Sequence, residues 1–178
     1  TVINNPDGSV SVFFRNGEEI SIDYRINAEQ KAVIASLPAT QSYVKGSYGR
    51  EANIMVATSE FSTLTLKSVC GWLKVQLTGY GEKVQSIKLR GNNGEQVAGL
   101  VYINSSTATM TLASEMGTSD DVEVGGVGGA LIFDDAIVKE VTLDCGDGVE
   151  LSTDKDSPTS FWIVLPATTF TSGFMIVI

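Results

Sequence analysis

The residue types that could carry chemistry are few in this chain of 178 residues, and histidine is absent. Histidine is the commonest general base and the commonest metal ligand. A Ser-His-Asp or Cys-His catalytic site therefore cannot be built from this chain alone. Its two cysteines, Cys70 and Cys145, cannot complete a zinc site of the usual four-ligand kind. We therefore expect no catalytic residues, no metal site and no cofactor.

Two acidic segments have the composition of calcium-binding loops, namely residues 144–148 (DCGDG) and 153–156 (TDKD). Closely spaced carboxylates can supply the oxygen ligands that calcium takes. Neither segment matches the EF-hand loop, so ordinary Asp/Gly turns are the simpler interpretation. Asp134 and Asp135 could suggest a carboxylate pair for glycoside hydrolysis, but neighbours on a strand point to opposite faces.

The glycine-rich run at residues 125–129 (GGVGG) superficially resembles a phosphate-binding loop. Such loops lie between a strand and the N-terminus of a helix, and no such pattern surrounds this run. We predict a polar, glycine-rich loop over residues 114–129 instead.

The cysteines and tryptophans leave alternatives open. Cys70 and Cys145 could form a disulfide in an exported protein, or remain two buried free thiols. Trp72 and Trp162 alternate out of phase with the apolar residues beside them. They pack between a sheet and a loop, or they lie exposed as a binding patch. The tyrosines that could stack on sugars beside them are Tyr24, Tyr43, Tyr48 and Tyr80.

The net charge of −9 is unevenly distributed. Residues 1–90 carry 10 Lys/Arg and 8 Asp/Glu, whereas residues 91–178 carry 2 Lys/Arg and 13 Asp/Glu. An acidic surface repels phosphate backbones, so we expect no nucleic-acid partner. No apolar run approaches the roughly 20 residues of a membrane helix, so we expect no transmembrane helix.

Short β-strands must position these residues. Residues 64–90 alternate apolar and polar types on both sides of the turn at residues 78–81, which predicts a β-hairpin. Asn16-Gly17 predicts a second hairpin. The alternation breaks at residues 68–71, where we expect a bulge or a helical turn. Other strands are predicted at residues 9–15, 19–25, 30–36, 53–58, 97–104, 107–113, 130–133, 137–145, 149–151, 161–165 and 174–178.

Frequent turns and the lack of a helical period predict an all-β fold, an antiparallel β-sandwich with short or no helices. The 178 residues suit one domain. Because the sequence stops in the strand-like run FMIVI, we expect this domain to be the first part of a longer protein. The predicted core consists of Leu64, Leu66, Leu73, Val75, Leu77, Ile87, Leu89, Val141, Leu143, Phe161, Ile163 and Leu165.

Four segments in order resemble the N-terminal domain of the fimbrillin-like proteins of Bacteroidales. They lie at residues 37–60, 64–103, 141–152 and 160–178. The order and spacing of the four segments together make the resemblance specific. The residues that carry the resemblance are Pro38, Ala39, Thr40, Gln41, Tyr43, Asn53, Met55, Val56, Ala57, Cys70, Gly71, Leu73, Lys74, Val84, Ser86, Ile87, Leu89, Ala98, Gly99, Val164, Pro166, Phe170, Gly173 and Phe174.

The resemblance implies a transthyretin-like Greek-key sandwich at the cell surface, made as an outer-membrane lipoprotein precursor. It implies a non-catalytic pilus (fimbria) subunit or adhesin, whose partners are other pilus subunits joined by β-strand exchange. A host protein or glycan is a further candidate partner. Processing after a basic residue frees the acceptor groove in this family, and Arg50 is the candidate here. The alternative function is a surface carbohydrate-binding or nutrient-uptake module that uses exposed aromatic residues such as Trp72.

Overall fold

The computed structural model describes residues 2–4, 9–12, 24–27, 32–57, 65–104, 107–115 and 137–178. Within them the chain is built of β-strands and two single-turn 3-10 helices, η1 (Arg50–Ala52) and η2 (Ala113–Glu115). The predicted all-β class with short helices is confirmed. In this part of the chain no helix is long and apolar enough to cross a membrane.

The strands are short, as the spacing of turn residues predicts. In chain order they are β1 (Val2–Asn4), β2 (Ser9–Val12), β3 (Tyr24–Asn27), β4 (Ala32–Leu37), β5 (Thr40–Ser42), β6 (Met55–Val56), β7 (Lys67–Ser68), β8 (Gly71–Leu77), β9 (Lys83–Gly91), β10 (Ala98–Asn104), β11 (Thr109–Leu112), β12 (Ile137–Val138), β13 (Glu140–Glu150), β14 (Thr159–Leu165) and β15 (Phe174–Val177).

The described strands form two larger sheets and two strand pairs. The larger sheet has the order β1-β2-β3-β4-β10-β11, with β12 also paired to β10. The second sheet has the order β15-β9-β13-β5, β8 pairs with β14, and β6 pairs with β7. The pairings between these strands are antiparallel except that of β13 with β5, and the isolated bridge between Thr78 and Ser152 is also parallel. The predicted pairing of residues 97–104 with 107–113 is confirmed as β10 with β11.

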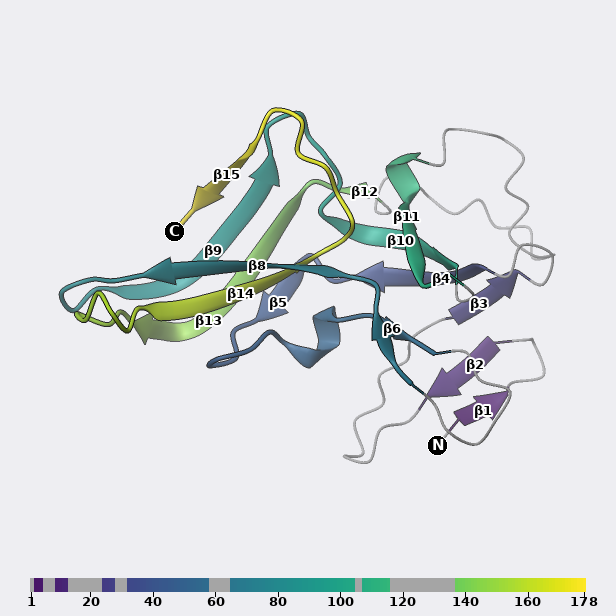
Figure 1. Ribbon diagram of the computed structural model, residues 1–178, viewed down its shortest axis with the longest axis horizontal. Helices are drawn as coiled ribbons and strands as arrows, with labels where there is room; N and C mark the ends of the chain where they lie inside the picture. The colour runs from purple at the N-terminus through teal and green to yellow at the C-terminus, as the bar shows by residue number, and fades with distance from the viewer. Residues whose placement is uncertain are drawn as a thin grey trace.

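Three chain segments pass directly from one large sheet into the other (Figure 1). They are β4 to β5, β9 to β10, and β12 to β13. The short connections between these strands tie the positions of the two sheets to each other.

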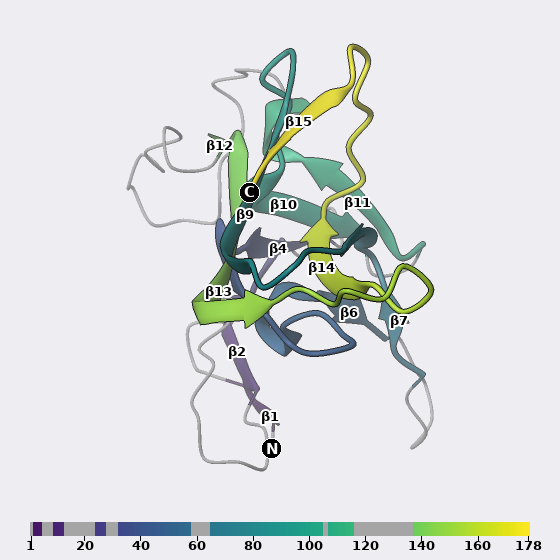
Figure 2. The same cartoon turned by 90° about the vertical axis from the view of Figure 1, so that its left-hand side faces the viewer.

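The first apolar cluster lies where β8 and β14 face β9 and β13 (Figures 1 and 2). Two layers of strands packed across an apolar core are the arrangement of a β-sandwich. Its buried residues are Val84, Ile87, Leu89, Val97, Val141, Leu143, Cys145, Phe161, Ile163 and Leu165. The members on β13 and β14 alternate with the predicted period of two, whereas on β9 Val84 is out of phase with Ile87 and Leu89. The transthyretin-like Greek key stays a prediction.

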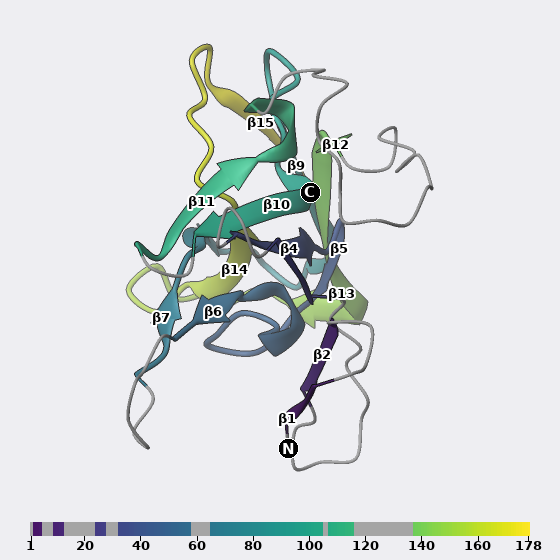
Figure 3. The ribbon, with the colours of Figure 1, turned by 90° about the vertical axis from the view of Figure 1, so that its right-hand side faces the viewer.

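The second apolar cluster lies between the sheet of β4, β10 and β11 and the segment that carries η1, β6 and β7 (Figure 3). Its buried residues include Leu37, Ala52, Val101 and Ile103. Val164 of β14 also belongs to it, although Phe161, Ile163 and Leu165 belong to the first cluster. Strand β14 therefore has apolar neighbours on both of its faces.

The hairpin predicted over residues 64–90 is wrong. Strand β8 pairs with β14, whereas β9 pairs with β13 and β15, so the turn at residues 78–82 crosses from one layer to the other. A second crossing, between β13 and β14, runs beside it, because Gly79 N donates to Ser152 O and Leu151 N donates to Glu82 O, both at 3.0 Å. Because β8 and β9 lie in opposite layers, the apolar side chains of one strand pack against those of the other. Neighbouring strands of a hairpin place their apolar side chains on the same face of one sheet, so the two sets cannot face each other.

The break at residues 68–71 is a change of partner rather than a helical turn. Strand β7 pairs with β6 and ends at Ser68, Val69 and Cys70 are both buried, and β8 begins its pairing with β14 at Gly71. The core prediction is wrong at Leu66, which precedes β7 and is 57% exposed. Leu73, Val75 and Leu77 are half-buried against the first cluster. The other described members of the predicted core are buried.

Several predictions fall on residues outside the described part of the chain. These are Leu64, the Asn16-Gly17 hairpin, the glycine-rich run at 125–129, the strand at 130–133, and Asp134 with Asp135.

Two leucines provide a matched test of this core. We expect Leu89→Ala, at a fully buried position, to lower the free energy of unfolding by about 2–5 kcal/mol, because it leaves a cavity. Leu66→Ala removes the same atoms from an exposed side chain and should change the free energy of unfolding by less than about 0.5 kcal/mol. Urea denaturation of both variants measures the difference, and equal losses would contradict the assignment.

Candidate functional site

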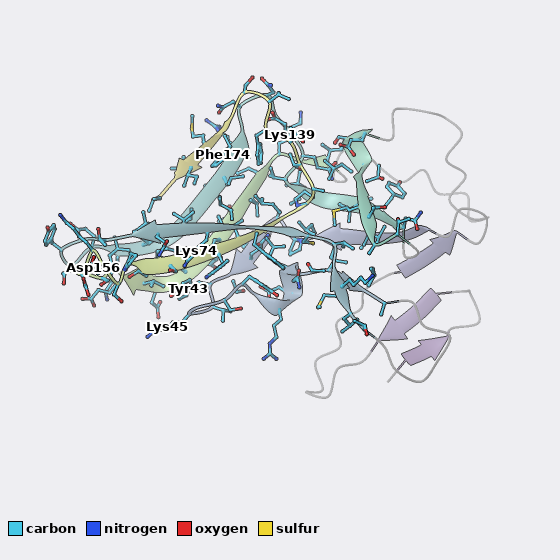
Figure 4. All side chains as sticks on the ribbon, in the orientation of Figure 1. Tyr43, Lys45, Lys74, Lys139, Asp156 and Phe174 are labelled. Atoms are coloured by element: carbon cyan, nitrogen blue, oxygen red, sulfur yellow. The ribbon has the colours of Figure 1, made fainter. Side chains whose placement is uncertain are left out.

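The strand pair β8–β14 has one face that points away from the first apolar cluster. This face carries Trp72 and Trp162, the two tryptophans proposed from the sequence as contact residues. In the register of the pair, Trp72 lies opposite Val164 and Lys74 lies opposite Trp162. Residues 43–57, which follow β5, contribute Tyr48 to this face. Lys74, with Tyr43 and Lys45 below it, is labelled in Figure 4.

Strand β14 is held on its second edge by a side chain rather than by a strand. Gln41 is 1% exposed, its Nε2 donates to Val164 O (2.8 Å), and its Oε1 accepts from Val164 N (2.9 Å). The side-chain amide thus makes the two hydrogen bonds that a neighbouring strand would make at this residue. Because Gln41 belongs to β5, the pair also joins the second sheet to the β8–β14 layer.

The alternation of an antiparallel ladder shows which backbone groups face outward. The N–H and C=O of Val164 point to Gln41 and thus away from β8. The backbone groups of Ser160 and Trp162 then point the same way. On the partner strand the corresponding groups of Trp72, Lys74 and Gln76 point away from β14. The outer edge of β8 therefore carries backbone donors and acceptors that no described strand pairs.

Trp72 is exposed and is supported from behind by another aromatic ring. Its ring lies parallel to that of Tyr48, with centroids 5.6 Å apart and an interplanar angle of 6°, and 48% of the residue is exposed. The hydroxyl of Tyr48 accepts from Asn53 Nδ2 (3.3 Å), and Asn53 Oδ1 accepts from Ser68 Oγ (2.7 Å). These bonds fix the Tyr48 ring, so the exposed ring of Trp72 has a rigid support.

Trp162 is half-buried beside this pair. The Lys74 ammonium lies 5.3 Å from the centre of the Trp162 ring, within the range of a cation–π contact. The indole Nε1 is buried without a hydrogen-bond partner. Of the two tryptophans predicted as contact residues, Trp72 presents an aromatic surface to solvent, whereas Trp162 mainly contacts the ammonium group of Lys74.

The two cysteines are free, buried thiols in different clusters. Cys70 lies in the second cluster, just before β8, and Cys145 lies on β13 in the first cluster. The disulfide is therefore not formed in this structure, and the alternative of two buried thiols describes it. Burial is the main cause that raises the pKa of both thiols, and nearby Asp144 adds to the rise at Cys145.

Arg50 is exposed, but the peptide bond that follows it lies in an ordered turn. Ala52, at the end of η1, is fully buried, and its N–H donates to Gly49 O (3.2 Å). Glu51 Oε1 accepts from Ser42 N (3.0 Å), which ties the turn to the end of β5. Because proteases bind extended chain, cleavage after Arg50 requires this turn to open locally.

The acidic segments form ordinary aspartate turns. Asp144 Oδ1 accepts from Gly146 N, and Asp154 Oδ1 accepts from Asp156 N, each at 2.9 Å. Gly146 and Gly148 have positive φ values of 57° and 99° at the point where the register of β13 against β9 shifts. Within the described residues, no three His, Cys, Asp or Glu side chains gather as metal ligands do.

Two features of this region were missed by sequence reasoning. Gln41 contributes to the family resemblance, but nothing in the run TQS predicts a buried amide that bonds a distant strand. Tyr48 was one of several tyrosines with no assigned position.

The Gln41–Val164 pair can be tested by mutation. Gln41→Leu should lower the free energy of unfolding by about 2–4 kcal/mol, because two buried backbone groups lose their partners. Gln76→Leu is the matched control on the exposed side of β8, where we expect a change within about 0.5 kcal/mol. Equal effects in urea denaturation would contradict the role of Gln41.

Thiol alkylation tests the state of the cysteines. At pH 8 and without reductant, we expect slow reaction of the native protein with iodoacetamide, because the raised pKa of both thiols keeps them protonated. After denaturation, still without reductant, intact mass should show an adduct on each cysteine. A denatured protein that takes up none would instead reveal a disulfide.

Comparisons with known proteins give no relative for this chain. No protein-family model, curated protein or solved structure matches it. The interpretation of the site therefore depends on the residues and contacts described above.

Proposed function

We propose that this chain is a non-catalytic structural and adhesive subunit of a bacterial cell-surface pilus, related to the fimbrillin-like proteins, that assembles by β-strand exchange. The extracellular location and the lipoprotein precursor belong to the same proposal. The observation that carries it is the position of the segment that contains β4 and β5.

This segment completes both layers of the fold. Strand β4 pairs with β10 from Gly99↔Leu37 to Asn104↔Ala32, and Ala35 and Leu37 are buried in the second cluster. Strand β5 pairs with β13 and supplies Gln41 to β14. If the segment left, the edges of β10, β13 and β14 would lose their partners together. A strand of another subunit could then add to those edges.

The position of Arg50 supports the proposal. It follows β5 by a short segment, so cleavage after it would separate the part of the chain that carries β1 to β5 from the rest without cutting any described strand. The segment would still be held by hydrogen bonds and core contacts. Its release therefore requires competition from an incoming strand, which ties opening of the groove to assembly.

Limited digestion of the full chain with an arginine-specific protease tests this function. We expect a new N-terminus at Glu51 and, at high protein concentration, oligomers that resist SDS without heating. Arg50→Lys keeps the charge but blocks this protease, so that variant should stay monomeric. Arg90→Lys, at an exposed position within β9, is the control and should behave like the original chain.

Two results would oppose the proposal. Persistent monomers after complete cleavage at Arg50 would remove strand exchange as the mode of assembly. A surface-assembled protein whose N-terminus lies well before Glu51 would exclude Arg50 as the processing site.

A further inference from the structure

We infer that Tyr48, Trp72, Lys74 and Trp162, here named the Trp72 platform, bind a carboxylate-bearing glycan such as a uronate or sialylated oligosaccharide. This site goes beyond the structural role proposed above and belongs to the uncleaved chain, because release of the segment that precedes Glu51 would remove Tyr48 from it.

The first argument is the shape and support of the aromatic surface. The Tyr48 ring lies parallel to and offset from the Trp72 ring, with centroids 5.6 Å apart, and about half of Trp72 remains exposed (48%). Hydrogen bonds through Asn53 to Ser68 hold Tyr48 in place. A fixed, flat indole loses little conformational entropy when a ligand stacks on it. The apolar C–H face of a pyranose ring is a ligand of matching shape.

The second argument is the neighbouring cation. Lys74 lies two residues from Trp72 on the same face of β8, at a separation of about 6.6 Å along the strand. This spacing allows one sugar ring to stack on Trp72 while its carboxylate meets the ammonium group. The contact with Trp162 (5.3 Å) holds that ammonium beside the indole without neutralising its charge.

The third argument is the local charge. The segments that build the platform, residues 43–57, 65–77 and 159–165, contain four cations (Lys45, Arg50, Lys67 and Lys74) and one acid, Glu51. The whole chain, in contrast, has a net charge of −9. The ion pair found among the described residues joins Lys88 to Glu140, so no carboxylate of the described residues lies within salt-bridge distance of Lys74. An anionic ligand therefore complements this face although the protein as a whole is acidic.

A sugar suits the surface better than an acidic peptide. Protein partners usually bury a tryptophan in a pocket near the centre of a well-packed interface. Here the back of Trp72 is already occupied by Tyr48, and what remains is a flat plate with a polar rim. The side chains of Lys74 and Gln76 and the outward backbone groups of β8 offer hydrogen bonds for sugar hydroxyls.

Calorimetric titration of the full chain tests the inference. The probes are oligosaccharides of hyaluronan and of polygalacturonate, and sialyllactose, at physiological salt. The uncharged controls are lactose for sialyllactose and the carboxyl-reduced forms of the two uronate oligosaccharides. We expect saturable binding of at least one carboxylated probe, and at least tenfold weaker binding of it by Trp72→Ala, which corresponds to about 1.4 kcal/mol. Trp72→Tyr should retain part of the affinity, which separates loss of stacking from loss of folding.

The charge contribution has its own readout. Lys74→Gln should weaken binding of the carboxylated probe and leave binding of its uncharged control unchanged. The controls are Tyr80→Ala, which removes an aromatic residue that is 84% exposed in a distant turn, and Lys155→Gln, which removes a cation from another loop. Both should bind like the original chain.

Three outcomes would overturn the inference. They are the absence of saturable binding to any of the three carboxylated probes, binding that Trp72→Ala leaves unchanged, and equal weakening by Lys155→Gln and Lys74→Gln. Tighter binding of an acidic peptide such as oligoglutamate would assign the surface to a protein partner instead. None of these results bears on polymer formation after cleavage at Arg50.

Discussion

Strand β14 has apolar neighbours on both faces, but among the described strands only β8 pairs with it. The rest of the fold depends on how its second edge is satisfied. Phe161, Ile163 and Leu165 pack in one cluster while Val164 packs in the other. An unpaired backbone group at such a position would cost free energy comparable to a lost hydrogen bond. The amide of Gln41 removes this cost at Val164, and in doing so it ties β5 to the opposite layer.

The same arrangement explains why the segment of β4 and β5 matters for assembly. It contributes backbone pairing to β10 and β13, apolar side chains to one cluster and an amide to β14. A segment with so many partners is costly to remove, yet a strand of similar pattern could replace most of its contacts. The proposed strand exchange therefore requires competition between two similar segments, not a permanently open groove.

The outer face of β8 and β14 has a different physical character from the rest of the molecule. Its aromatic residues are exposed or half-buried, and its charges are mainly positive in an acidic chain. Trp72 is held by stacking on Tyr48, and Trp162 is held by partial burial beside Lys74. Side chains that are already held in place lose little conformational entropy when a ligand binds.

The residue pattern alone was sufficient for the all-β class and for most of the core. The alternation in 86–90, 141–145 and 161–165 follows directly from the geometry of a strand, so positions such as Ile87, Leu143 and Ile163 could be assigned without a structure. The lack of histidine likewise excluded whole classes of catalytic site before any fold was known.

The partners of each strand and the positions of the polar side chains were decided by the tertiary structure. Alternation gives the same pattern whether β8 and β9 are neighbours in a sheet or face each other across a core, so the hairpin prediction failed there. Gln41 and Val164 are separated by 123 residues, and Cys70 and Cys145 lie in separate clusters. A local pattern specifies which face of a strand is buried, but only long-range packing decides which strand or side chain lies against it.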